Sequence, residues 1–367
     1  MRIVWAGTFD PEFSRNRKLA RLLAISNIQS QVVREDVWTP DRIGLATNPS
    51  LRVALTALVK YPRLLFRLLT AARPDLYLVS YPGWFDVPVV RLVASIKKRP
   101  LVFDPFVSLH DTVISDRQLH GPRSLVARMA WAIDRWSLRM ADLVIADTKP
   151  QLDLYGEIAG RLRAEGAVVP VGADDDVFVP RVDAEVRPRS ILFYGTLVPL
   201  QGVATIVDAA ALLEPDGIRT AIIGDGQDRP ALEDAIRRTG VKVELTGVLP
   251  LDELPAHLAT STVCLGIFGD SDKAGRVVPH KLFECLAMGR PVVTREGPGV
   301  RSLFEEGEVV TVPPADPLAL ADAVRSLVEE PDHRERVAAA GLAAYRQRFH
   351  ERPLAGLLVD ALEATTH

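Results

Sequence analysis

The sequence predicts an α/β protein of two domains, each a parallel β-sheet covered by helices. Short apolar runs alternate with helical patterns from one end of the chain to the other, which is typical of parallel α/β architecture. The 367 residues also exceed what one hydrophobic core of ordinary size contains, so the chain is expected to divide into two.

Six apolar runs in each half of the chain predict the strands. In the first half they are residues 2–6, 31–37, 75–80, 100–103, 142–146 and 167–171. In the second half they are residues 190–194, 219–223, 242–245, 262–267, 291–294 and 309–312. Helices are expected between them, for instance at 16–28, 84–97 and 124–140, and a last amphipathic helix at 353–364.

A segment without periodicity separates the two halves. Residues 172–189 are rich in Pro, Asp and Arg, which is typical of a linker. The first domain is therefore expected at 1–171 and the second at 190–349, with a helix at 350–367 that returns to the first domain. Three consecutive aspartates, 174–176, are expected to form a solvated turn in the linker rather than a metal site.

Composition excludes several classes of protein. A hydrophobic fraction of 48% and a charged fraction of 25% are those of a soluble globular protein, and a net charge of −3 does not favour nucleic acid. No apolar run reaches the roughly 20 residues of a membrane span, and the N-terminus is too quickly polar for a signal peptide. Histidines and cysteines lack metal-binding spacing, and Cys264 and Cys285 lie in apolar segments. We therefore expect a cytoplasmic, metal-free protein with two reduced core cysteines.

Residues 266–293 are the most informative part of the chain. They predict a buried strand, a loop rich in glycine and charge, and a short helix opened by Pro279 and closed by Gly289. Lys281 and Glu284 share one face of this helix. A helix N-terminus with a lysine suits an anion, and the carboxylate can accept hydrogen bonds from sugar hydroxyls, so together they suit a nucleoside diphosphate. The alternative is an ordinary surface pair worth about 0.3 kcal/mol.

Motifs in residues 169–312 resemble those of family 4 glycosyltransferases, in the same order and spacing. Residues 169–180 are similar to the family's interdomain segment, and 191–203 to the strand and loop that open its donor-binding domain. Residues 222–226 and 246–248 are similar to the next two loops, and 281–293 to the block E-A-x-A-x-G-x-P-V-V. The first half of the chain resembles the family only in its architecture.

This resemblance implies the GT-B fold, in which two Rossmann-like domains face each other across a cleft. It implies transfer of a sugar, with retention of configuration, from a UDP- or GDP-linked donor. The first domain is then the acceptor-binding side and the second the donor-binding side. The acceptor is expected to be a small molecule, a glycan or a lipid-linked group, and no cofactor beyond the donor is expected.

The chain departs from the family pattern at three positions. Arg276 stands where the resemblance leads us to expect a glutamate, and Thr196 and Gln201 stand where an Arg and a Lys commonly meet the diphosphate. The nearest cations in the sequence are Lys273, Arg276 and Lys281, which we expect to stabilise the leaving group instead.

Site residues follow from these motifs and from the loops after the strands. Catalytic roles are predicted for His110, Asp111, Arg276 and Lys281. Donor contacts are predicted for Gly195, Thr196, Gly224, Gly226, Thr246, Val248, Lys273, Val277 and Glu284. The acceptor or phosphate side is predicted to contain Asp10, Arg15, Arg17 and Asp104, and no residue is assigned to a metal. Solvated loops, helix caps and plain turns are the structural alternatives.

Two other functions remain in view. A non-catalytic nucleotide-sugar-binding protein on the same fold would fit the missing phosphate cations. A nicotinamide-dependent enzyme would need a third glycine after the first strand, which Met1–Glu35 does not supply.

The basic amphipathic segment 52–73 raises the question of peripheral membrane contact. We favour instead a helix that packs on the sheet and directs Lys60, Arg63 and Arg67 to water.

Overall fold

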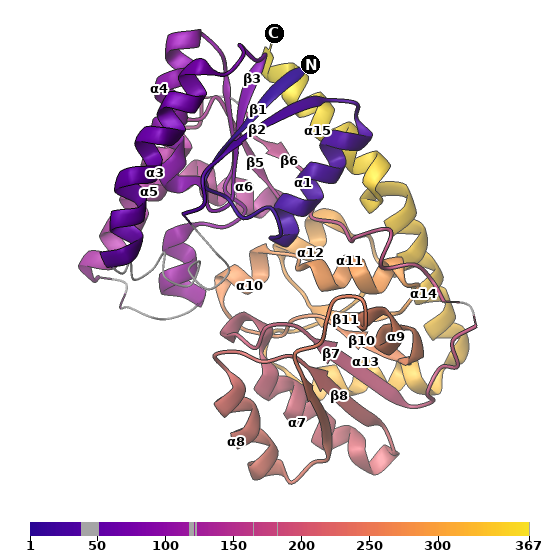
Figure 1. The fold of residues 1–367 in the computed structure, drawn as a ribbon. Helices are drawn as coiled ribbons and strands as arrows, with labels where there is room; N and C mark the ends of the chain where they lie inside the picture. Colours follow the sequence, from indigo (N-terminus) through magenta and orange to yellow (C-terminus); the bar gives the residue numbers. More distant parts are fainter. Residues whose placement is uncertain (38–50, 117–120, 122, 164, 182, 367) are drawn as a thin grey trace. The chain divides into compact units, whose positions relative to one another are not determined.

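The computed structural model describes residues 1–37, 51–116, 121, 123–163, 165–181 and 183–366. The chain forms two compact units (Figure 1). Unit 1 comprises Met1–Pro170 together with Glu351–His367, and unit 2 comprises Val171–His350. Each unit contains a parallel six-stranded sheet, which confirms the predicted α/β class.

The sheet of unit 1 has the strand order β2-β1-β3-β4-β5-β6. Its strands are β1 Arg2–Gly7, β2 Gln29–Arg34, β3 Leu76–Ser80, β4 Leu101–Asp104, β5 Leu143–Ala146 and β6 Ala167–Val168. Each predicted run overlaps a strand. The edge strand β2 begins two residues before the predicted 31–37 and ends at Arg34, because its first four residues are exposed and carry little apolar signal.

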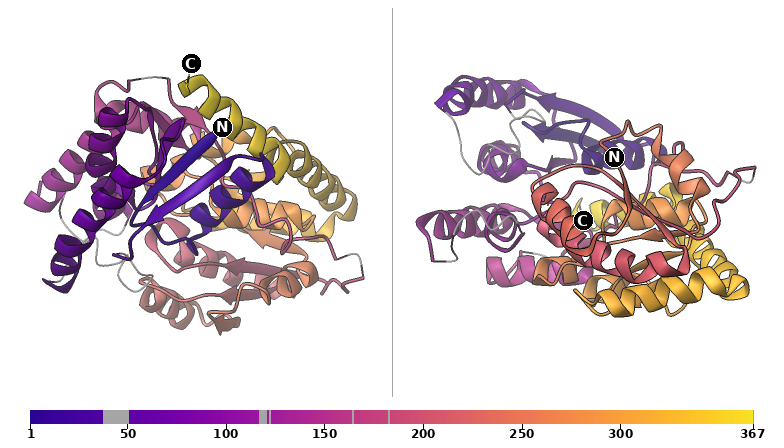
Figure 2. Two further views of the ribbon diagram at one scale, coloured as in Figure 1. Left: turned by 45° about the horizontal axis from the view of Figure 1, so that its top comes forward. Right: turned by 90° about the horizontal axis from the view of Figure 1, so that it is seen from below.

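Helices cover both faces of this sheet. They are α1 Ser14–Ile25, α3 Leu51–Thr70, η2 Gly83–Phe85, α4 Asp86–Lys97, η3 Asp111–Asp116, α5 Leu125–Met140, α6 Lys149–Ala159 and α15 Glu351–Thr366. Helices α3, α4, α5 and α6 share one core with the sheet, and α1 and α15 share the core of the opposite face (Figures 1 and 2). Helix α15 begins at Glu351, so Pro353 lies inside its first turn, where proline is tolerated.

The sheet of unit 2 has the strand order β12-β11-β10-β7-β8-β9. Its strands are β7 Ser190–Tyr194, β8 Arg219–Ile223, β9 Val243–Gly247, β10 Val263–Leu265, β11 Val292–Arg295 and β12 Val310–Val312. Its longer helices are α7 Val203–Leu213, α8 Arg229–Thr239, α9 Leu254–Thr260, α11 His280–Ala287, α13 Pro317–Glu329 and α14 Pro331–Ala344. Its shorter ones are η4 Pro199–Gln201, η5 Glu214–Asp216, α10 Asp272–Arg276, α12 Pro298–Leu303 and η6 Tyr345–Phe349. Cys264 and Cys285 are buried free thiols, as predicted.

The aspartates of the linker are not a solvated turn. Asp174 is buried, and Asp175 accepts a hydrogen bond from the hydroxyl of Tyr345. The carboxylate of Asp175 also lies 3.3 Å from Nε2 of His350. The prediction of solvent exposure holds for Asp176 alone, because Asp174 is buried and Asp175 contacts Tyr345 and His350.

The loop before α11 is more ordered than its composition predicted. It contains the short helix α10, whose N-cap Ser271 accepts a hydrogen bond from the backbone of Ala274. Pro279 occupies the N-cap of α11 and is not its first residue. Gly289 follows the helix with φ +66°, the left-handed conformation that favours glycine.

Candidate functional site

The carboxyl ends of β7, β8 and β9 form a cavity of about 190 Å³ in unit 2. Its walls are Tyr194, Gly195, Thr196, Ile223, Gly224, Asp225, Val248, Leu249 and Leu254. This edge of an open parallel sheet is where ligands bind in such folds. Four of the predicted donor residues, Gly195, Thr196, Gly224 and Val248, therefore lie together.

Two glycines let the loops of this cavity approach each other. A Cβ atom on Gly224, which has φ +136°, would lie 2.0 Å from the carbonyl oxygen of Gly195. A Cβ atom on Gly226, which has φ +156°, would lie 2.4 Å from the carbonyl oxygen of Leu197. Larger residues would force the loops apart, so both glycines are needed for loop packing whether or not they touch a ligand.

Lys281 is a buried cation beside the cavity. Lys281 is only 5% exposed, and its Nζ donates a hydrogen bond of 2.5 Å to Oε1 of Gln201. The same Nζ lies 3.7 Å from the centre of the Phe193 ring. Burial lowers the pKa of Lys281 to about 7, and the neighbouring Cys285 and Glu284 oppose this only in part. The alternative of a surface ion pair is therefore wrong.

Glu284 lies one turn further along α11. The hydroxyl of Tyr194, which lines the cavity, donates a hydrogen bond to Oε2 of Glu284. Burial and then the charge of Glu284 raise the pKa of Tyr194 well above its usual value, so the hydroxyl keeps its proton. Sequence reasoning assigned no role to Tyr194. The sequence signal that could have indicated this role is that Tyr194 ends β7 and is followed directly by Gly195.

Lys273, Arg276 and Val277 lie on or next to α10 (Figure 1), and α10 packs against η4. Because η4 contains Gln201, the partner of Lys281, this places the loop of the predicted cations beside the same part of unit 2. Arg295 supports the loop from β11 by donating hydrogen bonds to the carbonyls of residues 269 and 271, at 2.7 and 3.1 Å.

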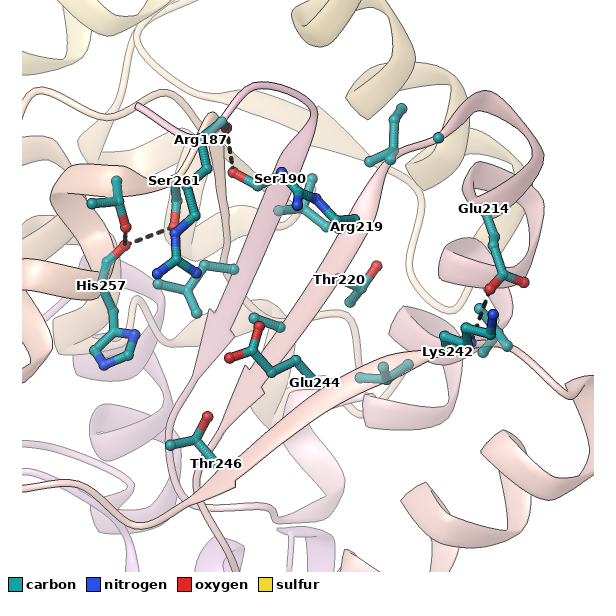
Figure 3. A pocket seen from close by; sticks show the side chains of 18 of the residues that line it. Arg187, Ser190, Glu214, Arg219, Thr220, Lys242, Glu244, Thr246, His257 and Ser261 are labelled. Atoms are coloured by element: carbon teal, nitrogen blue, oxygen red, sulfur yellow. Dashed lines mark hydrogen bonds between the residues drawn. The ribbon is translucent and has the colours of Figure 1, made fainter. Parts of the chain in front are cut away.

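Thr246 does not belong to this cavity. It lines a larger cavity of about 600 Å³, together with Glu244, Arg219 and His257 (Figure 3). The pairing of β8 with β9 is irregular here, because Ile222 pairs with residue 245 and Ile223 with residue 247. Thr246 is left out of the pairing, and it lines a different cavity from Val248, two residues later.

In unit 1, Arg15 and Asp104 form a fully buried ion pair. Nε of Arg15 lies 2.7 Å from Oδ2 of Asp104, and Nη1 donates to the carbonyl of Val169 at 2.9 Å. Burial raises the pKa of Asp104, and Arg15 opposes the shift. The structure brings these two predicted residues together, but their contacts join α1 to the ends of β4 and β6 and favour a structural role.

The side chains of Asp10 and Arg17 both form hydrogen bonds with the backbone of Glu12 in the first loop. Oδ1 of Asp10 accepts a hydrogen bond from the backbone of Glu12 at 3.0 Å, and Nη1 of Arg17 donates to the Glu12 carbonyl at 3.0 Å. Both side chains therefore order the turn that begins α1.

His110 and Asp111 lie at the start of η3, in a segment that Asp134 organises from α5. The buried carboxylate of Asp134 accepts hydrogen bonds from Ser108 Oγ at 2.7 Å and from the backbone of Leu109 and His110 at 3.0 and 2.9 Å. Burial raises its pKa to about 6 against these hydrogen bonds. Asp134 was not predicted. A lone carboxylate on the inner face of an amphipathic helix was its only signal in the sequence.

Three loops at the carboxyl edge of the same sheet contribute half-buried aromatic rings, which sequence reasoning also missed. The ring of Phe13 lies 4.5 Å from that of Tyr81 and 5.6 Å from that of Phe106. They follow β1, β3 and β4, so the topology gathers them where an acceptor is expected.

Two family models match the chain. One, for the glycosyl transferase 4-like domain, matches residues 20–172, and the other, for glycosyl transferases group 1, matches residues 188–330. The chain belongs to the family 4 glycosyltransferases. The first match also corrects the expectation that the first half resembles the family in architecture alone.

Curated relatives agree with this assignment. The alpha-D-kanosaminyltransferase of Streptomyces kanamyceticus is 32% identical over 153 residues, which are 40% of this chain and 38% of that protein. The D-inositol 3-phosphate glycosyltransferase of Xylanimonas cellulosilytica is 27% identical over 249 residues, 61% of this chain and 58% of that protein. The chain thus spans between 38% and 58% of the length of these two relatives.

Solved structures show the fold. Sucrose-phosphate synthase from Thermosynechococcus elongatus has a TM-score of 0.74 at 17% identity, covering 99% of both chains. HepE of Anabaena, in complex with UDP and glucose, has a TM-score of 0.70 at 17% identity, covering 99% of this chain and 100% of that chain. The expected GT-B fold is confirmed.

Proposed function

We propose that the protein is a glycosyltransferase that moves a sugar from a UDP- or GDP-linked donor to an acceptor hydroxyl. The observation that carries this proposal is the placement of a buried lysine and a carboxylate on one helix, α11, beside the cavity of β7, β8 and β9. The family and the names of the relatives support it, and so does the UDP bound in HepE.

Lys281 binds the diphosphate in this proposal. Breaking the bond between the sugar and the donor leaves a nucleoside diphosphate, so the site must stabilise developing negative charge. A lysine held near neutrality by burial regains its proton when the diphosphate arrives, and the new ion pair then forms away from water. Lys273 and Arg276 add charge from α10, and the reaction proceeds without a metal.

Glu284 recognises the ribose. Its carboxylate accepts hydrogen bonds from the two ribose hydroxyls while Tyr194 holds its other side. The base lies in the cavity between Gly224 and Val248, where backbone and apolar groups offer shape rather than charge.

Unit 1 provides the acceptor side. The loop of His110 and Asp111 and the rings of Phe13, Tyr81 and Phe106 form the acceptor site, for a small molecule, a glycan or a lipid-linked group. The sugar is transferred with retention of configuration, and the leaving phosphate helps to deprotonate the acceptor hydroxyl on the same face of the sugar.

Calorimetric titration with UDP, GDP, ADP and dTDP, in buffer containing a chelator, tests the donor site. One diphosphate is expected to bind, and Glu284→Ala should weaken it about 10- to 100-fold, because a charge-assisted pair of hydrogen bonds is lost. Glu335→Ala, at an exposed position of α14, is the matched control and should bind as the parent does. Absence of binding by all four would overturn the assignment.

Turnover distinguishes catalysis from binding. The protein is incubated with the sugar form of the diphosphate that binds and with candidate acceptors, and the diphosphate released is measured. Release that depends on Lys281 supports a transferase. If the protein binds the nucleotide sugar tightly but releases no diphosphate with any of the acceptors, the non-catalytic alternative is favoured.

A further inference from the structure

The larger cavity of unit 2 includes the amino ends of β7, β8 and β9, whereas the cavity assigned to the donor lies at their carboxyl ends. Ser190 and Arg219 begin β7 and β8, and Lys242 directly precedes β9 (Figure 3). We call it the amino-end cavity. Its volume of about 600 Å³ is within the range of small-molecule sites. Among the described residues, the two cavities have no lining residue in common, so they are separate places on the sheet.

The floor of the amino-end cavity is one face of the sheet. Leu192 pairs with Ala221, and Ala221 pairs with Glu244, so the side chains of these three residues lie side by side on the same face. Thr246 lines the cavity two residues after Glu244, and both are exposed. Val243 packs into the core on the other face of β9. The floor therefore offers apolar groups, a carboxylate and a hydroxyl to a ligand.

Two side chains with N–H donors form a wall of this cavity. Arg187 comes from the segment before β7 and His257 from α9, and Figure 3 shows the guanidinium and the imidazole on the same side of the cavity. In the part of the chain that the structure describes, no hydrogen bond or ion pair joins the polar ends of Arg187, His257 and Glu244 to another residue. Donors on the wall and an acceptor on the floor thus remain available to a ligand.

The charges around the amino-end cavity favour an anion. Three cations line it against two carboxylates, without counting the histidine: Arg187, Arg219 and Lys242 against Glu214 and Glu244. Glu214 accepts a hydrogen bond of 3.2 Å from the backbone of Lys242, so these two opposite charges lie close together. The excess positive charge is then that of Arg187 and Arg219 over Glu244.

A buried hydroxyl lies at the inner end of the cavity. Thr220 is 4% exposed, and its Oγ1 has no hydrogen-bond partner among the described residues. Thr220 lies on the opposite face of β8 from Ala221, and Ile236 of α8 lines the cavity with it. The cavity therefore continues into the layer between the sheet and α8. Because a buried hydroxyl without a partner is costly, a polar group is expected to reach it.

We propose that the amino-end cavity binds a small molecule that has both hydroxyl groups and an oxyanion, such as a phosphorylated sugar. Arg187 and His257 bind the oxyanion, a phosphate or a carboxylate, through charge-assisted hydrogen bonds. Glu244 and Thr246 form hydrogen bonds with the hydroxyl groups above the apolar part of the floor. A neutral sugar would leave the cations unpaired, and an inorganic anion would leave the carboxylate unpaired, so the combination fits better than either alone. This site does not depend on the proposed function.

Saturation-transfer difference NMR on the full chain tests the site, with glucose 6-phosphate, gluconate and glucose as the probes. Glucose 6-phosphate or gluconate is expected to bind at least about tenfold more tightly than glucose, because only they form an ion pair with a guanidinium. Binding of the first alone assigns the oxyanion as a phosphate, and binding of the second alone assigns it as a carboxylate. Inorganic phosphate should displace the bound probe only at concentrations about tenfold higher, because it lacks the hydroxyl contacts.

Matched variants locate the binding. Arg187→Ala should weaken the bound probe at least about fivefold, and Glu244→Gln should weaken it about threefold. Arg336→Ala and Glu335→Gln change the same residue types at exposed positions of α14 and should bind the probe as the parent protein does. All four substituted side chains are exposed, so the melting temperature of each variant should equal that of the parent and checks that it is folded.

Competition separates this site from the donor cavity. Saturating UDP or GDP should leave the binding of the probe unchanged, and displacement by either would place the probe in the donor cavity and overturn the proposal. Absence of binding by both anionic probes would also overturn it, and so would equal affinity for glucose or full binding by Arg187→Ala. If neither UDP nor GDP binds, the donor assignment fails, whereas the variants of the amino-end cavity still test this one.

Discussion

The buried Lys281 predicts how the affinity for a nucleoside diphosphate depends on pH. Without ligand its pKa is about 7, against 10.5 for a lysine in water, a difference of about 5 kcal/mol against the charged form. A bound diphosphate favours the charged form and raises the pKa of the complex. Binding therefore takes up protons wherever the pH lies between the two values.

The sign and size follow from this linkage. Below pH 7 the lysine is protonated in both states, so its contribution to affinity is complete. Above pH 7 the ligand-free protein loses the proton first, and the association constant should fall up to tenfold per pH unit until the pKa of the complex is reached. Between pH 7 and 9 the association constant should fall about 50-fold if the diphosphate restores most of the lysine's usual pKa.

Calorimetry at pH 7, 8 and 9, in pairs of buffers with different ionisation heats, measures both the affinity and the protons taken up. At pH 7 about half a proton should be bound per diphosphate. Lys281→Gln removes the titrating group, and its affinity should be weaker at pH 7 but nearly constant up to pH 9. If the affinity of the parent protein depends on pH as little as that of the variant, the assignment of Lys281 to the diphosphate is refuted.

Other predictions concern Tyr194 and Gly224 at the cavity of unit 2 and Asp134 in unit 1. Tyr194→Phe should weaken diphosphate binding about threefold to tenfold in the same titration, because the carboxylate of α11 loses a positioning hydrogen bond. Gly224→Ala should destabilise the protein by about 2–4 kcal/mol in urea unfolding, since its Cβ would overlap a backbone carbonyl, whereas Gly156→Ala in open space on α6 should be neutral or stabilising. Asp134→Ala should lower the turnover rate and leave diphosphate affinity unchanged, because it releases the backbone of His110; equal loss of both would indicate a general folding defect.

The fold could be predicted from the sequence because strands of a parallel sheet are buried on both faces and read as continuous apolar runs. The central strands β3, β7 and β8 lie where those runs are, within a residue. The edge strand β2 was displaced, since exposure removes the signal on which the prediction depends.

The site could be predicted only where its residues are close in sequence. Lys281 and Glu284 share a helix and a motif, so their common face could be predicted from spacing, while their role at a diphosphate was predicted mainly from the resemblance to the family. Tyr194 and Asp134 act through hydrogen bonds to residues 90 and 24 positions away, and only the tertiary structure brings these groups together. Thr246 lines another cavity than Val248, next to an irregular pairing of β8 with β9 that no local pattern reveals.

Helix α15 has a consequence for how the protein matures. Leu354, Leu358 and Leu362 complete the core that also contains Leu19 and Leu22 of α1, and Lys18 meets Glu351 at 3.0 Å. A nascent chain emerging from the ribosome can finish unit 2, whose residues are contiguous, while unit 1 still lacks this helix. Unit 1 therefore closes only after α15 has been synthesised, and the apolar surface of α1 stays exposed until then.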